Sequence, residues 1–263
     1  MCSSDLYDPK LSSSLFGLLI PNELKDHAEH VQLLVDRDSA QYPWELLTER
    51  SQPEKPLSTR IGIVRQFKAD DGRPSPQSAR GYQALVVGDT ADSGLVELDG
   101  AQAEAKRVAE VLRAGGYEVS EQIKKDGQTI VNELFAREYR ILHIAAHGAF
   151  DANDPTRSGV VLDGGLFLSS RELTNLRKVP DLVFINCCHL GKMEKTLSNQ
   201  SPHRLAAGVA EELIRIGVRA VIAAGWAVDD GAATAFADSF YRRMIAGEAF
   251  GQAVLQEGQR LGV

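Results

Sequence analysis

Cysteine is scarce in this sequence. The 263 residues include only three cysteines, at positions 2, 187 and 188. Cys187 and Cys188 are neighbours, and a disulfide between adjacent residues would be strained. A disulfide framework is therefore excluded, and we expect the thiols to be reduced.

Long apolar runs and an excess of positive charge are also missing. No stretch approaches the roughly 18 apolar residues that a membrane-spanning helix needs, and the N-terminus lacks the basic flank and apolar segment of a secretory signal. The formal net charge is −7, and no cluster of Lys and Arg is interleaved with aromatic residues, so direct binding of nucleic acid is not expected. We therefore expect a cytoplasmic protein without a membrane or nucleic-acid partner.

The remaining composition is that of an ordinary globular protein, with 43% hydrophobic and 25% charged residues. From residue 82 onwards, short runs that are apolar along their whole length alternate with amphipathic stretches. Such strands are typical of a sheet that helices cover on both faces. The pattern predicts a doubly wound, largely parallel α/β domain. Strands are predicted at 84–87, 117–123, 140–145, 182–186 and 218–223, and helices at 100–114, 129–137, 205–216, 231–246 and 250–260.

The predicted helix at 101–112 has an apolar stripe, formed by Ala101, Ala105, Val108, Ala109 and Leu112. We expect this face to pack on the sheet. The charged residues are predicted to lie away from it: Glu104, Lys106, Arg107 and Glu110.

Residues 7–80 are patterned differently from the rest. Strands are predicted at 15–20, 31–35 and 60–67, a helical turn at 21–27 and a short helix at 43–47. The segment 51–80 is rich in Pro, Ser, Asp and Lys, which predicts surface loops around one edge strand. We therefore expect an N-terminal part at 7–80 and a catalytic core at 81–263, together forming one structural unit.

Two apolar segments each end in a reactive side chain. Residues 140–150 read RILHIAAHGAF, and residues 181–191 read DLVFINCCHLG. Because ligands of open parallel sheets gather beyond the carboxyl ends of the strands, His147 and Cys188 would approach each other there if their strands are neighbours. A thiol beside an imidazole forms a cysteine nucleophile with its general base. The backbone N–H groups of Gly148 and Cys188 are then the expected oxyanion donors.

These motifs resemble the CHAT domain family, caspase-like cysteine peptidases of the clan that includes caspases, separase and gingipains. The resemblance also rests on the stretches GVVLDGGLFL with SSREL, GVRAVIAAGWAVDD and AFADSFYRRMIAG. It covers residues 82–256 and, more weakly, the earlier stretch LLVDRDSAQYPWELL. It implies a caspase-like α/β sandwich, a catalytic dyad of His147 and Cys188, and an endopeptidase without metal or cofactor. Cys187 takes the place of a small residue, which implies a packed neighbour of the nucleophile.

The resemblance further implies regulation. Such domains usually follow an N-terminal sensor region or answer to a partner protein, and some serve prokaryotic defence or cell death. The sequence stops where the family usually continues into a final strand, so we expect a fragment truncated at its C-terminus.

Other interpretations of the same residues stay open. His143, His147, Cys188 and His189 could be drawn as a zinc site, but H-x-x-x-H usually binds zinc from a helix, and adjacent cysteines are not a standard ligand spacing. A catalytically silent interaction module with the CHAT fold is the main alternative to a peptidase. Chemistry on a small molecule by the same dyad is another.

Several residues near predicted strand ends are candidates for substrate binding. Trp226, Asp229 and Asp230 follow one strand, and Asp89 follows another. An aspartate near Gly231 could equally cap the next helix, and Asp89 could equally be a turn residue. If an acid lines the substrate pocket, the residue before the scissile bond (P1) is expected to be basic.

Overall fold

The structure is a computed structural model. It describes residues 8–25, 30–36, 39, 42–52, 55–67, 77–91, 94–149, 159–163, 166–187, 202–224 and 228–261. The chain divides into two compact units, one formed by Met1–Lys68 with Arg242–Val263 and the other by Ala69–Tyr241. The expected boundary between residues 80 and 81 stays a prediction. Among the described residues, no helix combines the length and apolar character needed to cross a membrane.

The first unit contains a small parallel sheet. β1 (His30–Val35) pairs with β2 (Gly62–Phe67), which confirms the predicted strands at 31–35 and 60–67. α8 (Phe250–Leu261) packs against β2 and the short 3₁₀ helix η3 (Leu57–Thr59). The remaining elements are α1 (Pro9–Leu19), α2 (Asn22–Lys25) and the 3₁₀ helix η2 (Trp44–Leu46).

The predicted strand at 15–20 is wrong, because these residues belong to α1 and its C-terminal cap. The Asp8 carboxylate accepts hydrogen bonds from the backbone N–H groups of Lys10 and Leu11, at 2.8 and 3.3 Å. Pro9 occupies the first helical position, where its missing N–H is tolerated. This start signal precedes the apolar run and commits it to a helix that buries Phe16.

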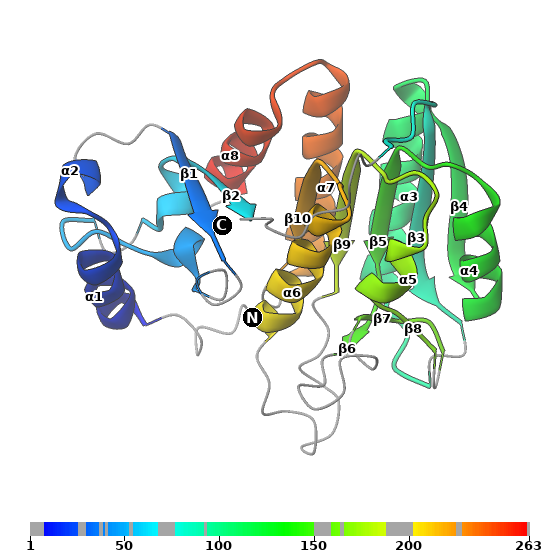
Figure 1. Ribbon diagram of the computed structural model, residues 1–263, viewed down its shortest axis with the longest axis horizontal. Coiled ribbons are helices and arrows are strands. Elements are labelled where there is room, and N and C mark those ends of the chain that lie inside the picture. Colours follow the sequence, from blue (N-terminus) through cyan, green and yellow to red (C-terminus); the bar gives the residue numbers. More distant parts are fainter. Residues whose placement is uncertain are drawn as a thin grey trace. The chain divides into compact units, whose positions relative to one another are not determined.

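The second unit is built on a five-stranded sheet of order β10-β9-β5-β3-β4, in which every pair is parallel (Figure 1). The predicted α/β fold with a largely parallel central sheet is confirmed. The strands are β3 (Gln83–Thr90), β4 (Glu118–Lys125), β5 (Ile141–Ala145), β9 (Leu182–Asn186) and β10 (Ala220–Ala223). The helices are α3 (Asp99–Ala114), α4 (Gly127–Ala136), α5 (Ser170–Thr174), α6 (Pro202–Arg215) and α7 (Asp230–Ile245), the last of which belongs to this unit as far as Tyr241.

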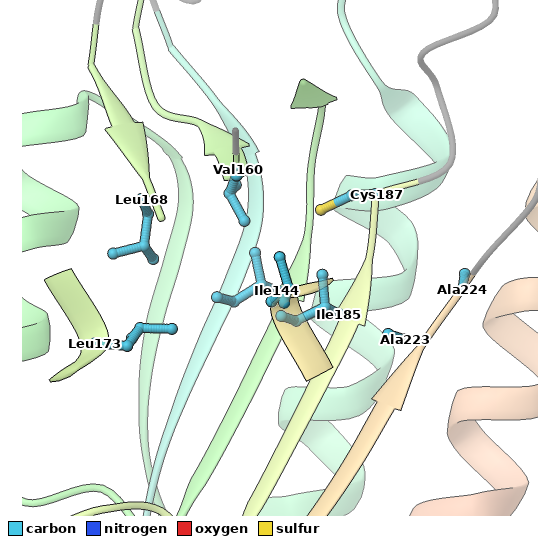
Figure 2. Close-up of a pocket in the computed structure, with 10 residues that line it drawn as sticks. Ile144, Val160, Leu168, Leu173, Ile185, Cys187, Ala223 and Ala224 are labelled. Carbon is cyan, nitrogen blue, oxygen red and sulfur yellow. The ribbon is translucent and has the colours of Figure 1, made fainter. Parts of the chain in front are cut away.

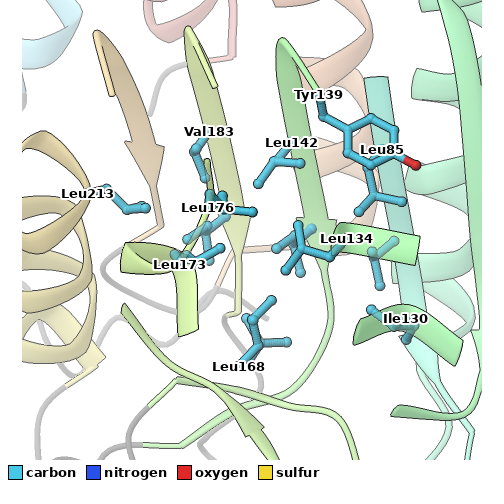
Figure 3. Close-up of a cluster of buried hydrophobic side chains, with 14 of the residues drawn as sticks. Leu85, Ile130, Leu134, Tyr139, Leu142, Leu168, Leu173, Leu176, Val183 and Leu213 are labelled. Atoms are coloured by element: carbon cyan, nitrogen blue, oxygen red, sulfur yellow. The ribbon is translucent and has the colours of Figure 1, made fainter. Parts of the chain in front are cut away.

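One face of the sheet carries the main apolar core. Side chains of α4, α5 and α6 meet strand residues such as Leu85, Leu142 and Val183 there. Figure 2 shows the part of this core near the carboxyl ends of the strands, where Ile144 and Ile185 line a small cavity. Figure 3 shows its centre, where Ile130, Leu134, Leu173 and Leu213 pack over the strands.

The opposite face is covered by α3 and α7. Gly88 of β3 lies so close to α3 that a Cβ atom added to it would be 2.3 Å from the Cβ of Ala105. Further along the sheet, Phe184 of β9 packs against the rings of Phe236, Phe240 and Tyr241 from α7. Close helix packing at one end and aromatic packing at the other therefore cover this face.

A buried polar network crosses the same face. His143 of β5 has no exposed surface, and its Nδ1 lies 3.2 Å from the Tyr241 hydroxyl. Its Nε2 lies 3.3 Å from Oε1 of Glu104, within ion-pair reach but misaligned for a hydrogen bond. The other carboxylate oxygen of Glu104 accepts a hydrogen bond of 2.7 Å from the Asn186 side chain. Burial raises the pKa of Tyr241, and the Glu104 charge raises it further. The hydroxyl therefore stays protonated and can donate a hydrogen bond to Nδ1 of His143.

The prediction that Glu104 lies away from the sheet is therefore wrong, since Glu104 is 1% exposed. Helix periodicity places it on the rim of the apolar stripe, and the charge of its side chain alone argued for solvent. Polar partners on β5 and β9 offset the desolvation of the carboxylate. Those partners are distant in sequence, so the helix pattern carries no sign of them.

A small antiparallel sheet lies beyond the carboxyl end of β5. It comprises β6 (Gly148–Ala149), β7 (Gly159–Val161) and β8 (Phe167–Leu168). β7 pairs with both neighbours, and α5 follows β8 directly. The backbone of β6 is therefore fixed immediately after His147.

The packing of β3 on α3 is testable with Gly88→Ala. The added methyl group would overlap the Ala105 side chain, so we expect a loss of about 2 to 3 kcal/mol in the free energy of unfolding. Gly81→Ala is the control, because the nearest atom to its added Cβ is the end of the Gln83 side chain, at 3.3 Å. Urea denaturation measures both variants, and equal stabilities would contradict the packing described.

The polar network predicts a second stability difference. Glu104→Ala would remove the buried carboxylate that accepts a hydrogen bond from the Asn186 side chain, which should lower the free energy of unfolding by about 2 to 3 kcal/mol. Glu110→Ala, on the exposed side of the same helix, removes only a surface ion pair with Arg107 and should change it by less than about 0.5 kcal/mol. Thermal and urea unfolding of the two variants compare them directly, and an equal effect would argue that the network does not stabilise the sheet.

Candidate active site

The candidate site lies where three strands end side by side. In the register of the sheet, Gly88 of β3 is opposite Ala145 of β5, and Ala145 is opposite Asn186 of β9. The expectation that the His147 and Cys188 strands are neighbours is confirmed. Beyond the strands, the Ala146 N–H donates to the Asn186 carbonyl at 3.1 Å. The segment that leads to Cys188 is therefore tied to the residue before His147.

At this edge of the sheet, the connections that follow β3 and β5 lead to opposite sides. β4 lies on one side of β3 and β5 lies on the other, and open parallel sheets usually bind ligands beyond two strands whose connections run apart in this way. The connection after β3 leads through Val96 into α3, and the connection after β5 begins with Ala146 and His147. His147 therefore lies at the position where such sheets usually bind ligands.

His147 is held by a backbone carbonyl. Its ring nitrogen Nε2 lies 2.6 Å from the carbonyl oxygen of Val96, and the residue is 5% exposed. Because a carbonyl oxygen only accepts hydrogen bonds, Nε2 must carry the hydrogen. In the neutral ring Nδ1 is then the nitrogen with the lone pair, and it is the one that can take a proton.

The backbone at His147 is fixed by β7. The Val161 N–H donates to the His147 carbonyl at 2.8 Å, and Gly148 is opposite Val160. In an antiparallel ladder, residues alternate between facing the partner strand and facing away from it. The Gly148 N–H is therefore directed away from β7, as a donor to a bound ligand would need to be.

Cys187 packs into the apolar core. It is 6% exposed, belongs to the main core cluster and lines the small cavity beside Ile144 and Ile185 (Figure 2). Side chains alternate along β9, so Phe184 and Asn186 face the opposite layer with α3 and α7. The prediction that Cys187 is a packed neighbour is confirmed.

Other predicted residues lie outside the described part of the chain. These are Cys188, His189 and Trp226. The zinc interpretation depends on two of them, and within the ranges that are described no three His, Cys, Asp or Glu side chains gather as metal ligands.

Two of the predicted pocket acids lie at the start of α7. Oδ1 of Asp229 accepts hydrogen bonds from the N–H groups of Gly231 and Ala232, at 3.0 and 3.1 Å. It therefore has the capping role that was weighed for this position. Asp230 packs over α3, because a Cβ atom added to Gly100 would be 2.3 Å from its Cγ. Both acids are exposed, and their contact with a substrate stays a prediction.

Asp89 is placed differently from those two acids, since it is 2% exposed and has a positive φ of 55°. Its carboxylate accepts hydrogen bonds from the N–H groups of Thr90 and Leu98 and from the Gln102 side chain. Its side chain is engaged within the protein.

Sequence reasoning missed three groups at this site: the Val96 carbonyl, the Glu104 carboxylate and the Asn186 amide. Val96 acts through its backbone, so its side chain carries no signal. Asn186 carries a weak one, since a polar residue ends an otherwise apolar strand directly before the cysteine pair.

Comparisons with known proteins agree with this geometry. The family model of the CHAT domain matches residues 8–261. One similar solved structure is the complex of the pro- and mature domains of RgpB from Porphyromonas gingivalis, at 13% identity and a TM-score of 0.52, with 96% of this chain and 63% of that chain covered. Another is the Arg-specific cysteine proteinase gingipain R, at 13% identity and a TM-score of 0.49, with 96% and 62% covered.

This chain thus spans less than two thirds of the length of those gingipain chains. No curated protein matches it. The likeness to the RgpB complex shows that the fold is that of the gingipain cysteine proteinases, and the match over residues 8–261 shows the family. This chain belongs to the CHAT domain family.

Proposed function

We propose that this chain is a cysteine endopeptidase in which His147 is the general base and Cys188 is the nucleophile. The observation that carries the proposal is the hydrogen bond from His147 Nε2 to the Val96 carbonyl. With the hydrogen on Nε2, Nδ1 is the proton acceptor of the ring. His147 lies at the edge of the sheet where β9 ends, and β9 ends two residues before Cys188. Membership of the CHAT family supports the same assignment.

In the proposed reaction, Nδ1 of His147 takes the proton from the Cys188 thiol, and the thiolate attacks the carbonyl carbon of a peptide bond. The N–H groups of Gly148 and Cys188 stabilise the negative oxygen of the tetrahedral intermediate. The imidazolium then returns its proton to the leaving amine, and a thioester remains on Cys188. A water molecule, deprotonated by His147, hydrolyses the thioester and restores the thiol.

The substrate of the proposed peptidase is a protein. The activity of the peptidase is controlled by an upstream sensor or a partner protein. It acts in the cytoplasm, where its thiols stay reduced, and serves in prokaryotic defence or cell death. These proposals rest on the family resemblance. Residues 81–263 are the catalytic core in this scheme.

The dyad predicts different effects for the two neighbouring cysteines. Cys188→Ala should lower peptide cleavage by about 1,000-fold or more, because no nucleophile remains. Cys187→Ala should keep the cleavage rate and lower the free energy of unfolding by about 1 kcal/mol, because it removes a buried side chain from the core. Mapping of new N-termini in a proteome, after incubation with each variant, measures the cleavage.

A peptide-like, thiol-directed inactivator should label the parent protein and Cys187→Ala but not Cys188→Ala. Cleavage lost in Cys187→Ala and kept in Cys188→Ala would overturn the nucleophile assignment. A parent protein that neither cleaves nor is labelled would instead favour the silent interaction module.

Substrate preference tests the acids near α7. If Asp229, Asp230 and Trp226 line the P1 pocket, cleavage sites should carry Arg or Lys at P1. Asp230→Asn should then lower kcat/KM for an Arg peptide by about 10-fold or more, since a charge-assisted contact is lost. Profiling with a peptide library gives the preference. Cleavage after Asp or Leu in the parent protein would contradict the basic pocket.

A further inference from the structure

Asp89 is a buried carboxylate near the end of β3 that accepts hydrogen bonds from Thr90 of the same strand and from Leu98 and Gln102. Oδ1 accepts from the Thr90 N–H at 2.8 Å, and Oδ2 accepts from the Leu98 N–H at 3.1 Å. Oδ2 also accepts from Nε2 of Gln102 in α3, at 3.1 Å. With 2% of its surface exposed, Asp89 has almost no area to offer a substrate.

The bond to Leu98 fixes the loop that orients His147. Leu98 is two residues after Val96, whose carbonyl accepts the His147 ring proton. The Val96 side chain is 72% exposed, so apolar packing of that side chain does little to hold the loop. Gln102 ties the same loop a second time, because its Nε2 also donates to the Glu97 carboxylate at 3.1 Å. Asp89 and Gln102 therefore hold the segment at residues 97 and 98.

A second connection runs through the neighbour of Asp89. The Thr90 hydroxyl donates to the Val161 carbonyl at 3.1 Å, and the Val161 N–H donates to the His147 carbonyl at 2.8 Å. The bond from the Thr90 N–H to Asp89 closes this path. The end of β3 thus supports the His147 ring through Val96 and the His147 backbone through Val161.

The backbone of Asp89 fits this role. Its φ of 55° lies in the left-handed region, which Asp and Asn adopt more readily than other residues with a side chain. In this conformation the carboxylate accepts the hydrogen bonds from Leu98 and Gln102. A residue held in such a conformation and fully hydrogen-bonded inside the protein is suited to fixing a loop.

We propose that Asp89 is a positioning residue that sets the orientation of the His147 ring through the Leu98 N–H and the Val96 carbonyl. The inference rests on the proposed function, since it matters for catalysis only if His147 is the base. It differs from a pocket role for Asp89, in which the carboxylate would contact the substrate. The two roles make different kinetic predictions.

The first test is steady-state kinetics of Asp89→Asn and Gln102→Ala in the full chain, with a peptide that the parent protein cleaves. Asparagine tolerates the left-handed backbone but has one acceptor oxygen instead of two. We expect kcat to fall about 10-fold or more with KM unchanged, because misplacement of a catalytic group slows the chemical step. Gln102→Ala should give a smaller fall of the same kind. A raised KM with unchanged kcat would overturn the inference in favour of substrate binding.

The control is Asp126→Ala, which removes another aspartate that caps backbone N–H groups, here at the start of α4. It should lower stability and leave kcat unchanged. If it lowers kcat as much as Asp89→Asn does, general loosening of the fold explains both results and the inference fails.

The second test does not depend on activity. Nitrogen-15 NMR of the imidazole ring is compared between Cys188→Ala and the double variant Cys188→Ala with Asp89→Asn, at a pH where the ring is neutral. We expect His147 to carry its hydrogen on Nε2 in the first protein and to show a mixture of both tautomers in the second. A single Nε2–H tautomer in both would overturn the inference even if the peptidase proposal holds. The expected change in an inactive protein would support it even if that proposal fails.

Discussion

The parallel pairing of β5 with β3 and β9 is the constraint on which the candidate site depends. Gly88, Ala145 and Asn186 form the last row in which the three strands pair with one another. Asp89, His147 and Cys188 each follow that row by one or two residues. A shift of one residue in either pairing would reverse the faces of a whole strand. In the β5–β9 pairing, such a shift would move Asn186 from Glu104 into the apolar core and Cys187 out of that core.

The two faces of the sheet contribute differently to this arrangement. The face under α4, α5 and α6 is apolar and carries the main hydrophobic cluster. The face under α3 and α7 holds the charged and polar groups Glu104, His143 and Asn186. Apolar packing is tolerant of small shifts, whereas hydrogen bonds have narrow distance and angle ranges. We infer that both faces supply stability and that the polar groups of the second face also fix the register near the site.

Much of the fold follows from local patterns in the sequence. The inner strands β3, β5 and β9 are apolar along most of their length because both of their faces are covered, whereas the edge strand β4 is largely polar. Apolar patterns fail where a residue outside the pattern decides, whether it is near in the sequence or far away. Asp8 and Pro9 start a helix, so α1 forms where a strand was predicted. Glu104 is buried because it accepts a hydrogen bond from Asn186, which is far away in the sequence. His147 was predictable as a side chain at a strand end, but the Val96 carbonyl that orients it was not.

The Val96 contact could not be predicted because backbone atoms, and not side chains, hold His147 in place. The ring of His147 is oriented by the carbonyl of Val96, and its backbone is held by the N–H of Val161. Every residue has such a carbonyl, so the identity of residue 96 does not encode the contact, and its side chain is left 72% exposed. The sequence must instead encode the path of the loop. In the proposed arrangement, this path is set by residues whose side chains bind backbone groups, such as Asp89. A buried acid at a strand end therefore has two possible meanings, and the burial of its carboxylate distinguishes a residue that shapes the site from one that meets the substrate.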